Sequence, residues 1–275
     1  MTPTVRQALA QCGLAPVDAK ALLTHVLDCN RAWLAAHPMD ALTQAQAHAF
    51  AELAQRRRVG EPVAYLTGTR EFWGLDLTVT PDVLIPRPET ETLVEFALSK
   101  LPRDCPLRVL DLGTGSGAIA LALAHDRPNV QVLGTDSSAP ALAVAIGNAR
   151  RLGIANAAFA AADWYAGIPP GSWNLIVSNP PYVGAVDPHL QEGDVRFEPV
   201  AALSPGVDGH SALNIIVSGA REHLVPGGWL VVEHGYDQSV AIQALFRAAG
   251  FSGVVALRDL AGIPRVVAGK SGDTL

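Results

Sequence analysis

The stretch Leu107-Arg-Val-Leu-Asp-Leu-Gly-Thr-Gly-Ser-Gly117 is a short apolar strand that runs into a glycine-rich turn. The residues that follow, Ala118–His125, have helical composition. Glycine lets a backbone approach a ligand closely, and a strand, a glycine turn and a helix in this order open the nucleotide-binding α/β domains. We therefore predict an α/β domain that holds an adenosine-containing cofactor.

The glycine turn alone leaves the identity of that cofactor open. Read strictly, Gly113, Gly115 and Ala118 also satisfy the dinucleotide pattern Gly-x-Gly-x-x-Ala. Asp136 follows at about the distance expected for a ribose-binding acid, roughly 20 residues on. An NAD(P)-dependent oxidoreductase therefore stays an alternative at this point.

Strands and helices continue to alternate after the glycine turn. Strands are predicted at Val130–Thr135, Ala157–Ala162 and Trp173–Ser178, with a helix at Pro140–Leu152. This order predicts a parallel, doubly wound sheet with its ligand site at the carboxyl ends of the strands. The unusual residues all fall at such strand ends: Asp111, Gly113, Gly115, Gly117, Asp136, Asp163, Trp164 and Asn179.

The last of these strands is stopped by Asn179-Pro180-Pro181-Tyr182. Proline lacks the N–H that a strand ladder requires, so the turn could be only a strand terminator. However, the Asn179 carboxamide oxygen and the Pro180 carbonyl are two acceptors close together, which suits a planar –NH2 group with two hydrogens to donate. Tyr182 adds an aromatic face and a hydroxyl.

The beginning of the chain has helical periodicity. Apolar residues three and four apart predict short helices at Thr4–Gln11, Val17–Leu27, Arg31–His37 and Thr43–Arg58. The run Arg56-Arg57-Arg58 at the end of the last helix suits the helix dipole and is expected to be solvated, with contact to an acidic partner as the alternative.

From Thr69 the pattern changes to alternation. Two strands, Phe72–Val79 and Asp82–Pro86, are predicted around a turn at Thr80-Pro81. A rigid, charged segment that contains Arg87 then leads into a helix ending near Lys100. Arg87 is held stiffly between two prolines, so a role near a substrate is as reasonable as a purely structural one.

A long loop, Val183–Gly209, follows the Asn-Pro-Pro-Tyr turn and is expected to lie beside the site. Its charged residues are expected to be solvated, with substrate contact as the alternative; they are Asp187, Glu192, Asp194, Arg196 and Glu198. The remaining predicted elements are a helix at Ser211–Leu224, a strand at Trp229–His234, a helix at Gln238–Ala249 and a final antiparallel pair at Gly253–Leu257 and Arg265–Ala268.

Composition limits the class of protein. The 275 residues are 49% hydrophobic, yet no run approaches the roughly 18–20 apolar residues of a membrane-spanning helix. The first residues lack the charged start and apolar block of a signal peptide, so we expect a soluble, cytoplasmic protein with no membrane partner. The net charge of −6 argues against stable nucleic-acid binding through phosphate neutralisation. The histidines and cysteines have no metal-ligand spacing, so no metal site is predicted.

Taken together, the glycine turn, Asp136, Asp163-Trp164 and the Asn-Pro-Pro-Tyr turn resemble the seven-stranded S-adenosylmethionine-dependent methyltransferases. The resemblance implies that the glycine turn and Asp136 hold the methionine end and ribose of S-adenosylmethionine, that Asp163-Trp164 holds its adenine, and that S-adenosylhomocysteine is the product. The cofactor-binding residues implied are Asp111, Gly113, Thr114, Gly115, Ser116, Gly117, Asp136, Asp163, Trp164 and Asn179. The substrate-binding residues implied are Asn179, Pro180, Pro181 and Tyr182, of which Asn179 and Pro180 are also catalytic.

The order of these parts narrows the resemblance. A helical beginning, a hairpin, the phrase Leu84-Ile-Pro-Arg-Pro-Glu-Thr-Glu91 and the Asn-Pro-Pro-Tyr turn are similar to the protein-(glutamine-N5) methyltransferases that modify peptide chain release factors. The expected organisation is an N-terminal helical substrate-recognition domain at 1–68, a β-hairpin linker at 69–86 and a methyltransferase domain at 87–275. The implied partner is a release factor, methylated on the glutamine of its Gly-Gly-Gln loop, and we expect a monomer.

Two further classes stay as alternatives. A methyltransferase that acts on the exocyclic amine of adenine or cytosine would use the same acceptor turn, but would need a basic surface and a pocket for a flipped base. A methyltransferase-like binding module without activity is disfavoured by the complete set of motif residues.

Overall fold

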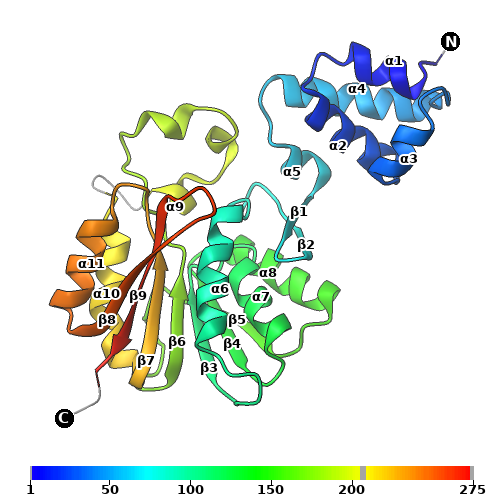
Figure 1. Ribbon diagram of the computed structural model, residues 1–275. Helices are drawn as coiled ribbons and strands as arrows, with labels where there is room; N and C mark the ends of the chain where they lie inside the picture. The colour runs from blue at the N-terminus through cyan, green and yellow to red at the C-terminus, as the bar shows by residue number, and fades with distance from the viewer. Residues whose placement is uncertain (1, 205–208, 273–275) are drawn as a thin grey trace. The chain divides into compact units, whose positions relative to one another are not determined.

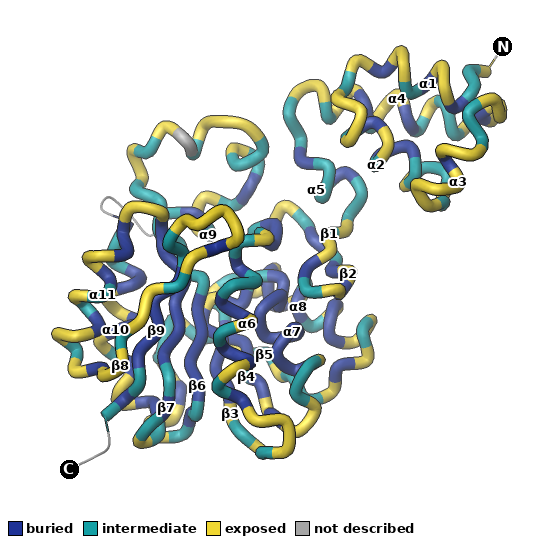
Figure 2. The backbone as a smooth tube through the Cα atoms, in the orientation of Figure 1, coloured by how far each residue is buried: buried dark blue, intermediate teal, exposed yellow. Residues whose placement is uncertain are grey.

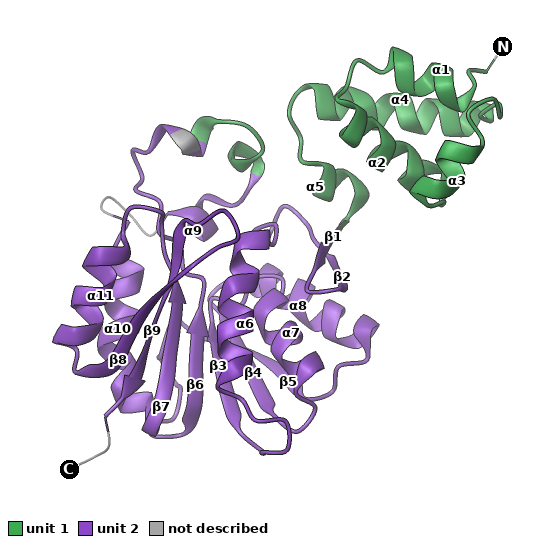
Figure 3. Ribbon diagram, viewed as in Figure 1, with its two compact units in different colours: residues 1–69, 191–197 green, residues 70–190, 198–275 purple. Residues whose placement is uncertain are grey.

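The computed structural model of the chain describes residues 2–204 and 209–272. The fold divides into two compact units (Figure 3). The N-terminal unit consists of residues 1–69 together with 191–197, and the sheet unit consists of residues 70–190 and 198–275. Figure 1 is coloured by residue number, so the two segments of each unit can be traced in it.

The N-terminal unit is a small helical bundle. Its helices are α1 (Val5–Gln11), α2 (Pro16–Leu27), α3 (Arg31–Ala36), α4 (Gln44–Arg58) and α5 (Val63–Thr67). The Thr4 and Thr43 side chains form capping boxes at the starts of α1 and α4, and Asn30 caps α3. Apolar side chains, among them Leu22, Leu23 and Phe50, form the core of the bundle. The four predicted helices are confirmed, and α5 was not predicted.

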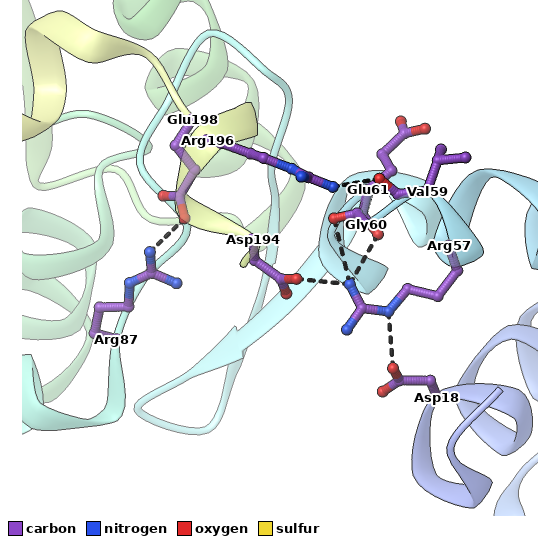
Figure 4. A network of polar contacts seen from close by, with 9 residues as sticks. All are labelled: Asp18, Arg57, Val59, Gly60, Glu61, Arg87, Asp194, Arg196 and Glu198. Atoms are coloured by element: carbon purple, nitrogen blue, oxygen red, sulfur yellow. Dashed lines mark hydrogen bonds and ion pairs between the residues drawn. The ribbon is translucent and has the colours of Figure 1, made fainter. Parts of the chain in front are cut away.

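Of the arginines at the end of α4, Arg56 and Arg58 are exposed, as expected, whereas Arg57 is half-buried and paired. Arg57 donates to Asp18 at 2.8 Å and to Asp194 at 2.6 Å, as Figure 4 shows. It also donates to the backbone carbonyl of Glu61 at 3.1 Å. The Asp194 of the 191–197 segment is therefore paired, because the forked guanidinium can serve several acceptors at once.

The sheet unit is built on one twisted sheet. Within the described residues it has seven strands, in the order β5-β4-β3-β6-β7-β9-β8, so the predicted seven-stranded doubly wound sheet is confirmed. The strands are β3 (Arg108–Leu112), β4 (Gln131–Asp136), β5 (Ala157–Ala161), β6 (Trp173–Ser178), β7 (Leu224–Glu233), β8 (Phe251–Arg258) and β9 (Pro264–Ser271). Strands β3 to β7 pair in parallel, whereas β9 is antiparallel to both β7 and β8, as expected for the last pair.

Helices cover both faces of this sheet (Figure 1). They are α6 (Glu91–Ser99), α7 (Ala118–Asp126), α8 (Ala139–Leu152), α10 (Ser211–His223) and α11 (Ser239–Ala248). Alternate residues of one strand face opposite layers: Leu175 and Val177 of β6 pack with α6 and α7, whereas Ile176 packs with α10 and α11. The central strands are therefore buried on both sides, which Figure 2 shows in dark blue.

The hairpin after the helical bundle was predicted with the wrong strands. It consists of β1 (Thr69–Phe72) and β2 (Leu75–Thr78), with the turn at Trp73-Gly74. Both turn residues have positive φ, 55° and 71°, as a two-residue hairpin turn requires. The segment Asp82–Pro86 is not a strand. Its Ile85 N–H donates to the Glu198 carboxylate at 3.1 Å instead of to a strand partner.

The long loop after Tyr182 is more ordered than predicted. It contains 3₁₀ turns at Pro188–Gln191 and Val195–Phe197 and a short helix, α9 (Val200–Leu203); residues 205–208 lie outside the described part of the chain. Glu198 was expected to be solvated, but its side chain is fully buried and pairs with Arg87 (Figure 4). Of the helices that the structure describes, none is long and apolar enough to cross a membrane.

Candidate functional site

The order of the strands reverses between β3 and β6, which is where ligands bind in open α/β sheets. The last residues of these two strands, Leu112 and Ser178, are register partners. The Ser178 hydroxyl locks the pair by donating to the Leu112 carbonyl at 2.7 Å. The residues that follow, Gly113 and Asn179, therefore leave the sheet side by side, as the sequence predicted for strand ends.

The glycine turn needs its glycines for two reasons. Gly113, Gly115 and Gly117 have φ values of 71°, 54° and 83°, a region that other residues rarely adopt. At Gly117 a Cβ atom would also lie 3.1–3.3 Å from Leu121, Ala145 and Phe159, so this residue serves close packing. The turn is rigid, because Thr114 N–H donates to the Thr135 carbonyl at 2.8 Å.

Asp111 lies beneath the turn and is fully buried. Its Oδ2 accepts a 2.6 Å hydrogen bond from the Thr114 hydroxyl, and burial raises the pKa of its carboxyl to about 7. Its Oδ1 is buried without a hydrogen-bond partner among the described residues. Asp111 therefore supports the turn from below and does not line its open side.

Asp136, at the end of β4, ties the glycine turn to the start of α8. One carboxylate oxygen accepts from Gly115 N–H and the other from Ser138 N–H, each at 2.9 Å. A carboxylate oxygen can accept more than one hydrogen bond, so both oxygens of Asp136 can also accept hydrogen bonds from the hydroxyl groups of a ligand. The next strand leads to Asp163, which is exposed, and to Trp164, which is half-buried with a φ of 50°. A Cβ atom on Gly113 would lie 3.8 Å from the Trp164 ring, so the ring reaches the glycine turn.

The Asn179 amide is oriented by one contact. Its Nδ2 donates to the Thr90 hydroxyl at 3.2 Å. Within the described residues, neither the Asn179 carboxamide oxygen nor the Pro180 carbonyl accepts a hydrogen bond. Both acceptors named in the sequence argument are therefore left for a ligand.

Tyr182 is held from the neighbouring strand. Its hydroxyl donates to Oε1 of Glu233, the last residue of β7, at 3.1 Å. Burial raises the pKa of Tyr182, and the nearby Glu233 raises it further, so this hydroxyl stays protonated and acts as a donor. Burial also raises the pKa of Glu233, to about 7, against the opposing hydrogen bond from Tyr182.

A pocket of about 370 Å³ opens over these strand ends. It brings most of the predicted residues together: Gly113, Thr114, Gly115, Ser116, Asp136, Asp163, Trp164, Asn179 and Pro181 line it. Four predicted residues are not in its lining, namely Asp111, Gly117, Pro180 and Tyr182. Asp111 and Gly117 support the turn, and Tyr182 points its hydroxyl towards Glu233.

Three residues near the Asn-Pro-Pro-Tyr turn were not predicted as functional. Thr90 contacts Asn179, Glu233 contacts Tyr182, and Glu198 holds Arg87, which lines the pocket. Glu233 carried a usable signal, because an acidic residue at the end of an otherwise apolar strand has to be buried with a partner. Thr90 and Glu198 carried no comparable signal in the sequence.

The chain matches two family models. Residues 4–68 match the PrmC N-terminal domain and residues 90–192 match the methyltransferase small domain. The release factor glutamine methyltransferase of Xylella fastidiosa is 50% identical over 269 residues, which is 98% of each chain. The protein of the same name from Bordetella pertussis is 52% identical over 266 residues, covering 96% of this chain and 98% of its own.

The fold is also found among solved structures. A methyltransferase from Pyrococcus furiosus matches with a TM-score of 0.56 and 19% identity, covering 81% of this chain and 99% of its own. That likeness concerns the fold alone. The two bacterial relatives, in contrast, are about 50% identical in sequence over nearly the full length of this chain, so their similarity covers both the N-terminal unit and the sheet unit. The chain belongs to the release factor glutamine methyltransferase family.

Proposed function

We propose that this protein transfers a methyl group from S-adenosylmethionine to the side-chain amide nitrogen of the glutamine in the Gly-Gly-Gln loop of peptide chain release factors. The observation that carries the proposal is the pair of free acceptors on Asn179 and Pro180, at the strand switch point beside the glycine turn. Family membership supports the choice of a glutamine amide over other planar –NH2 groups.

The residues around the pocket fit S-adenosylmethionine. The volume of about 370 Å³ lies in the usual range for small-molecule sites, about 300–1,000 Å³. Gly113 and Gly115 allow close backbone approach, Asp136 offers acceptors for ribose hydroxyls, and the Trp164 ring offers a face for adenine. When bound, the cofactor supplies an electrophilic methyl group. The remaining cofactor contacts that we propose are Thr114, Ser116, Asp163 and Asn179, whereas Asp111 and Gly117 act by supporting the glycine turn.

The chain's own contribution to the reaction is to hold and activate an amide. The lone pair of an amide nitrogen is delocalised into its carbonyl, which makes the nitrogen a poor nucleophile. If the Asn179 oxygen and the Pro180 carbonyl accept both amide hydrogens, electron density is returned to the nitrogen and its lone pair is directed towards the pocket. Positioning and fixed dipoles can then supply most of the acceleration, and the methylated nitrogen releases one of its two hydrogens as a proton to give the neutral N-methyl amide. Pro181 and Tyr182 complete the substrate site.

The N-terminal domain, residues 1–68, is proposed to recognise the release factor, with the segment 69–86, which begins with the hairpin of β1 and β2, as its link to the methyltransferase domain at 87–275. We further propose a cytoplasmic monomer without stable nucleic-acid binding. A net charge of −6 supports the absence of stable nucleic-acid binding, because non-specific nucleic-acid binding depends on phosphate neutralisation by Lys and Arg.

The test is to incubate the protein with labelled S-adenosylmethionine and either a release factor or unmethylated DNA and RNA. Mass spectrometry should find one methyl group on the glutamine of the Gly-Gly-Gln loop. The variant Asn179→Ala should lower kcat by roughly 10²–10³, as expected for removal of one preorganised hydrogen-bonding group. Label only in nucleic acid would contradict the substrate, and an Asn179→Ala variant with a normal rate would contradict the mechanism.

A further inference from the structure

Arg87 lines the pocket and has no role in the amide chemistry proposed above. It lies between Pro86 and Pro88, and its backbone is extended, with φ −100° and ψ 141°. Its guanidinium Nη2 donates to Oε1 of Glu198, and this is the one hydrogen bond of the side chain within the described residues. A guanidinium carries five N–H donors and the Arg87 side chain is 31% exposed, so donors remain for a ligand in the pocket.

A buried carboxylate holds the Arg87 segment in place. The Glu198 side chain is fully buried, and besides pairing with Arg87 it accepts from Ile85 N–H at 3.1 Å. One group thus fixes both the backbone and the side chain of the segment. An arginine that is paired with one carboxylate can still bind a second, as Arg57 does in the N-terminal unit. The pair with Glu198 therefore orients the guanidinium and leaves it able to bind another anion.

The charge of the pocket lining singles out Arg87. Among the described residues that line the pocket, the acidic ones are Asp82, Asp136 and Asp163, and Arg87 is the only basic one. S-adenosylmethionine carries a sulfonium and an ammonium group, which suit acidic side chains, and one carboxylate, which does not. A carboxylate that leaves water needs a cation or N–H donors as partners. Arg87 is the cation that the pocket offers to it.

The glycine turn is poorly suited to hold that carboxylate. Free backbone N–H groups at such turns and at helix starts often bind anions. Here, Thr114 N–H donates to the Thr135 carbonyl at 2.8 Å. Gly117 N–H donates to the Thr114 carbonyl at 2.8 Å, and Gly115 N–H donates to the Asp136 carboxylate at 2.9 Å. These three N–H groups are therefore used within the fold, and the Asp136 carboxylate repels a further anion.

Arg87 also borders the part of the pocket where the cofactor reacts. Thr90, three residues after Arg87, accepts a hydrogen bond from Asn179 at 3.2 Å. In the proposed reaction the methyl group is delivered at the Asn179 turn, and the methionine chain begins at the sulfur that carries this methyl group. We propose that Arg87 binds the α-carboxylate of S-adenosylmethionine, with Glu198 holding the guanidinium in place. This inference rests on the proposed function, which supplies the cofactor.

The test compares S-adenosylmethionine with decarboxylated S-adenosylmethionine, which differs only in lacking the carboxylate. Isothermal titration calorimetry measures the Kd of each ligand for the unchanged protein and for Arg87→Met, which keeps an apolar stem and removes the charge. Arg87→Met should weaken binding of S-adenosylmethionine by about 10–100-fold, the usual range for a hydrogen bond to a charged group. It should weaken binding of the decarboxylated ligand by less than about threefold. Equal losses for both ligands, or no loss for either, would overturn the inference.

Two further variants guard against a structural effect. Arg87→Met leaves the buried Glu198 without its charged partner, so the double variant Arg87→Met/Glu198→Gln removes this charge and keeps an acceptor for Ile85 N–H. It should also lose affinity for S-adenosylmethionine alone, and a loss for both ligands would contradict the inference. Arg70→Met is the matched control, because Arg70 donates to the Pro86 carbonyl at 3.2 Å in the same segment but does not line the pocket. It should leave both Kd values unchanged.

The outcomes separate this inference from the proposed function. If the unchanged protein binds neither ligand, the proposed cofactor is wrong and the inference falls with it. If Arg87→Met binds S-adenosylmethionine normally but has a raised KM for a release factor, Arg87 contacts the protein substrate. In that case the inference alone is wrong and the proposed function stands.

Discussion

Replacing Glu198 with alanine removes a carboxylate that joins two segments at the rim of the pocket. Its Oε2 accepts from Ile85 N–H at 3.1 Å, and its Oε1 pairs with the Arg87 guanidinium. Arg87 lines the pocket from one segment and Pro199, the neighbour of Glu198, lines it from the other. The perturbation therefore tests whether the segment before α6 is fastened to the segment before α9.

The size of the effect follows from the exposure of the three groups. Removing one partner of a fully buried ion pair costs about 3–5 kcal/mol. Arg87 is 31% exposed and can be rehydrated, so its share is smaller, whereas Ile85 N–H is left without its acceptor at a cost of about 1–3 kcal/mol. We expect Glu198→Ala to lower the free energy of unfolding by about 2–4 kcal/mol. Glu198→Gln keeps one acceptor and should lose about half as much.

Urea unfolding followed by tryptophan fluorescence measures this change. The sheet unit holds Trp73, Trp164, Trp173 and Trp229, so its unfolding dominates the signal. Glu192→Ala is the control, since Glu192 is an exposed carboxylate of the same loop and its loss should change stability by less than about 0.5 kcal/mol. If Glu198→Ala unfolds at the same urea concentration as Glu192→Ala, the buried pair does not fasten the rim and the reasoning fails.

Three further predictions follow from other contacts. Trp164→Ala should weaken S-adenosylmethionine binding by about 1–3 kcal/mol in calorimetry, a typical size for base stacking on an aromatic ring, while kcat at saturating cofactor changes less. For Glu233, burial raises the pKa from 4.5 to about 7, so between these values the folded state holds a proton that the unfolded state has released. Its contribution to stability therefore falls as pH rises, and the unfolding free energy of the unchanged protein relative to Glu233→Gln should drop by about 2–3 kcal/mol between about pH 5 and pH 8 in urea titrations. Finally, Arg57→Lys cannot reproduce the forked contacts to Asp18 and Asp194, so trypsin should cleave after Arg196 several-fold faster than in the unchanged protein, with no change after Arg150 or Arg151.

The layers of the fold were predictable because strong local signals agree with one another. The apolar runs before Gly113 and Asn179 are buried on both faces, and such strands occur in parallel sheets covered by helices. The hairpin was not predictable, because its turn at Trp73-Gly74 uses a tryptophan with a φ of 55°. An aromatic residue normally favours a strand, so the sequence pattern predicts one unbroken strand across the position of the turn. Buried Val83 and Ile85 extended the same pattern without strand pairing.

The residues of the site also fall into those that could be predicted from the sequence and those that could not, and the difference has a physical reason. A residue that must touch a ligand at a strand end is marked by its own chemistry, as Gly113 and Asn179 are, because glycine and Asn-Pro have few other reasons to be there. A residue that acts on another side chain is marked only by its partner. Thr90 is typical of the residues at the start of a helix, and only its 3.2 Å contact with Asn179 distinguishes it. The Asn179 amide thus donates to a residue 89 positions away in the chain, a contact that local sequence patterns do not record.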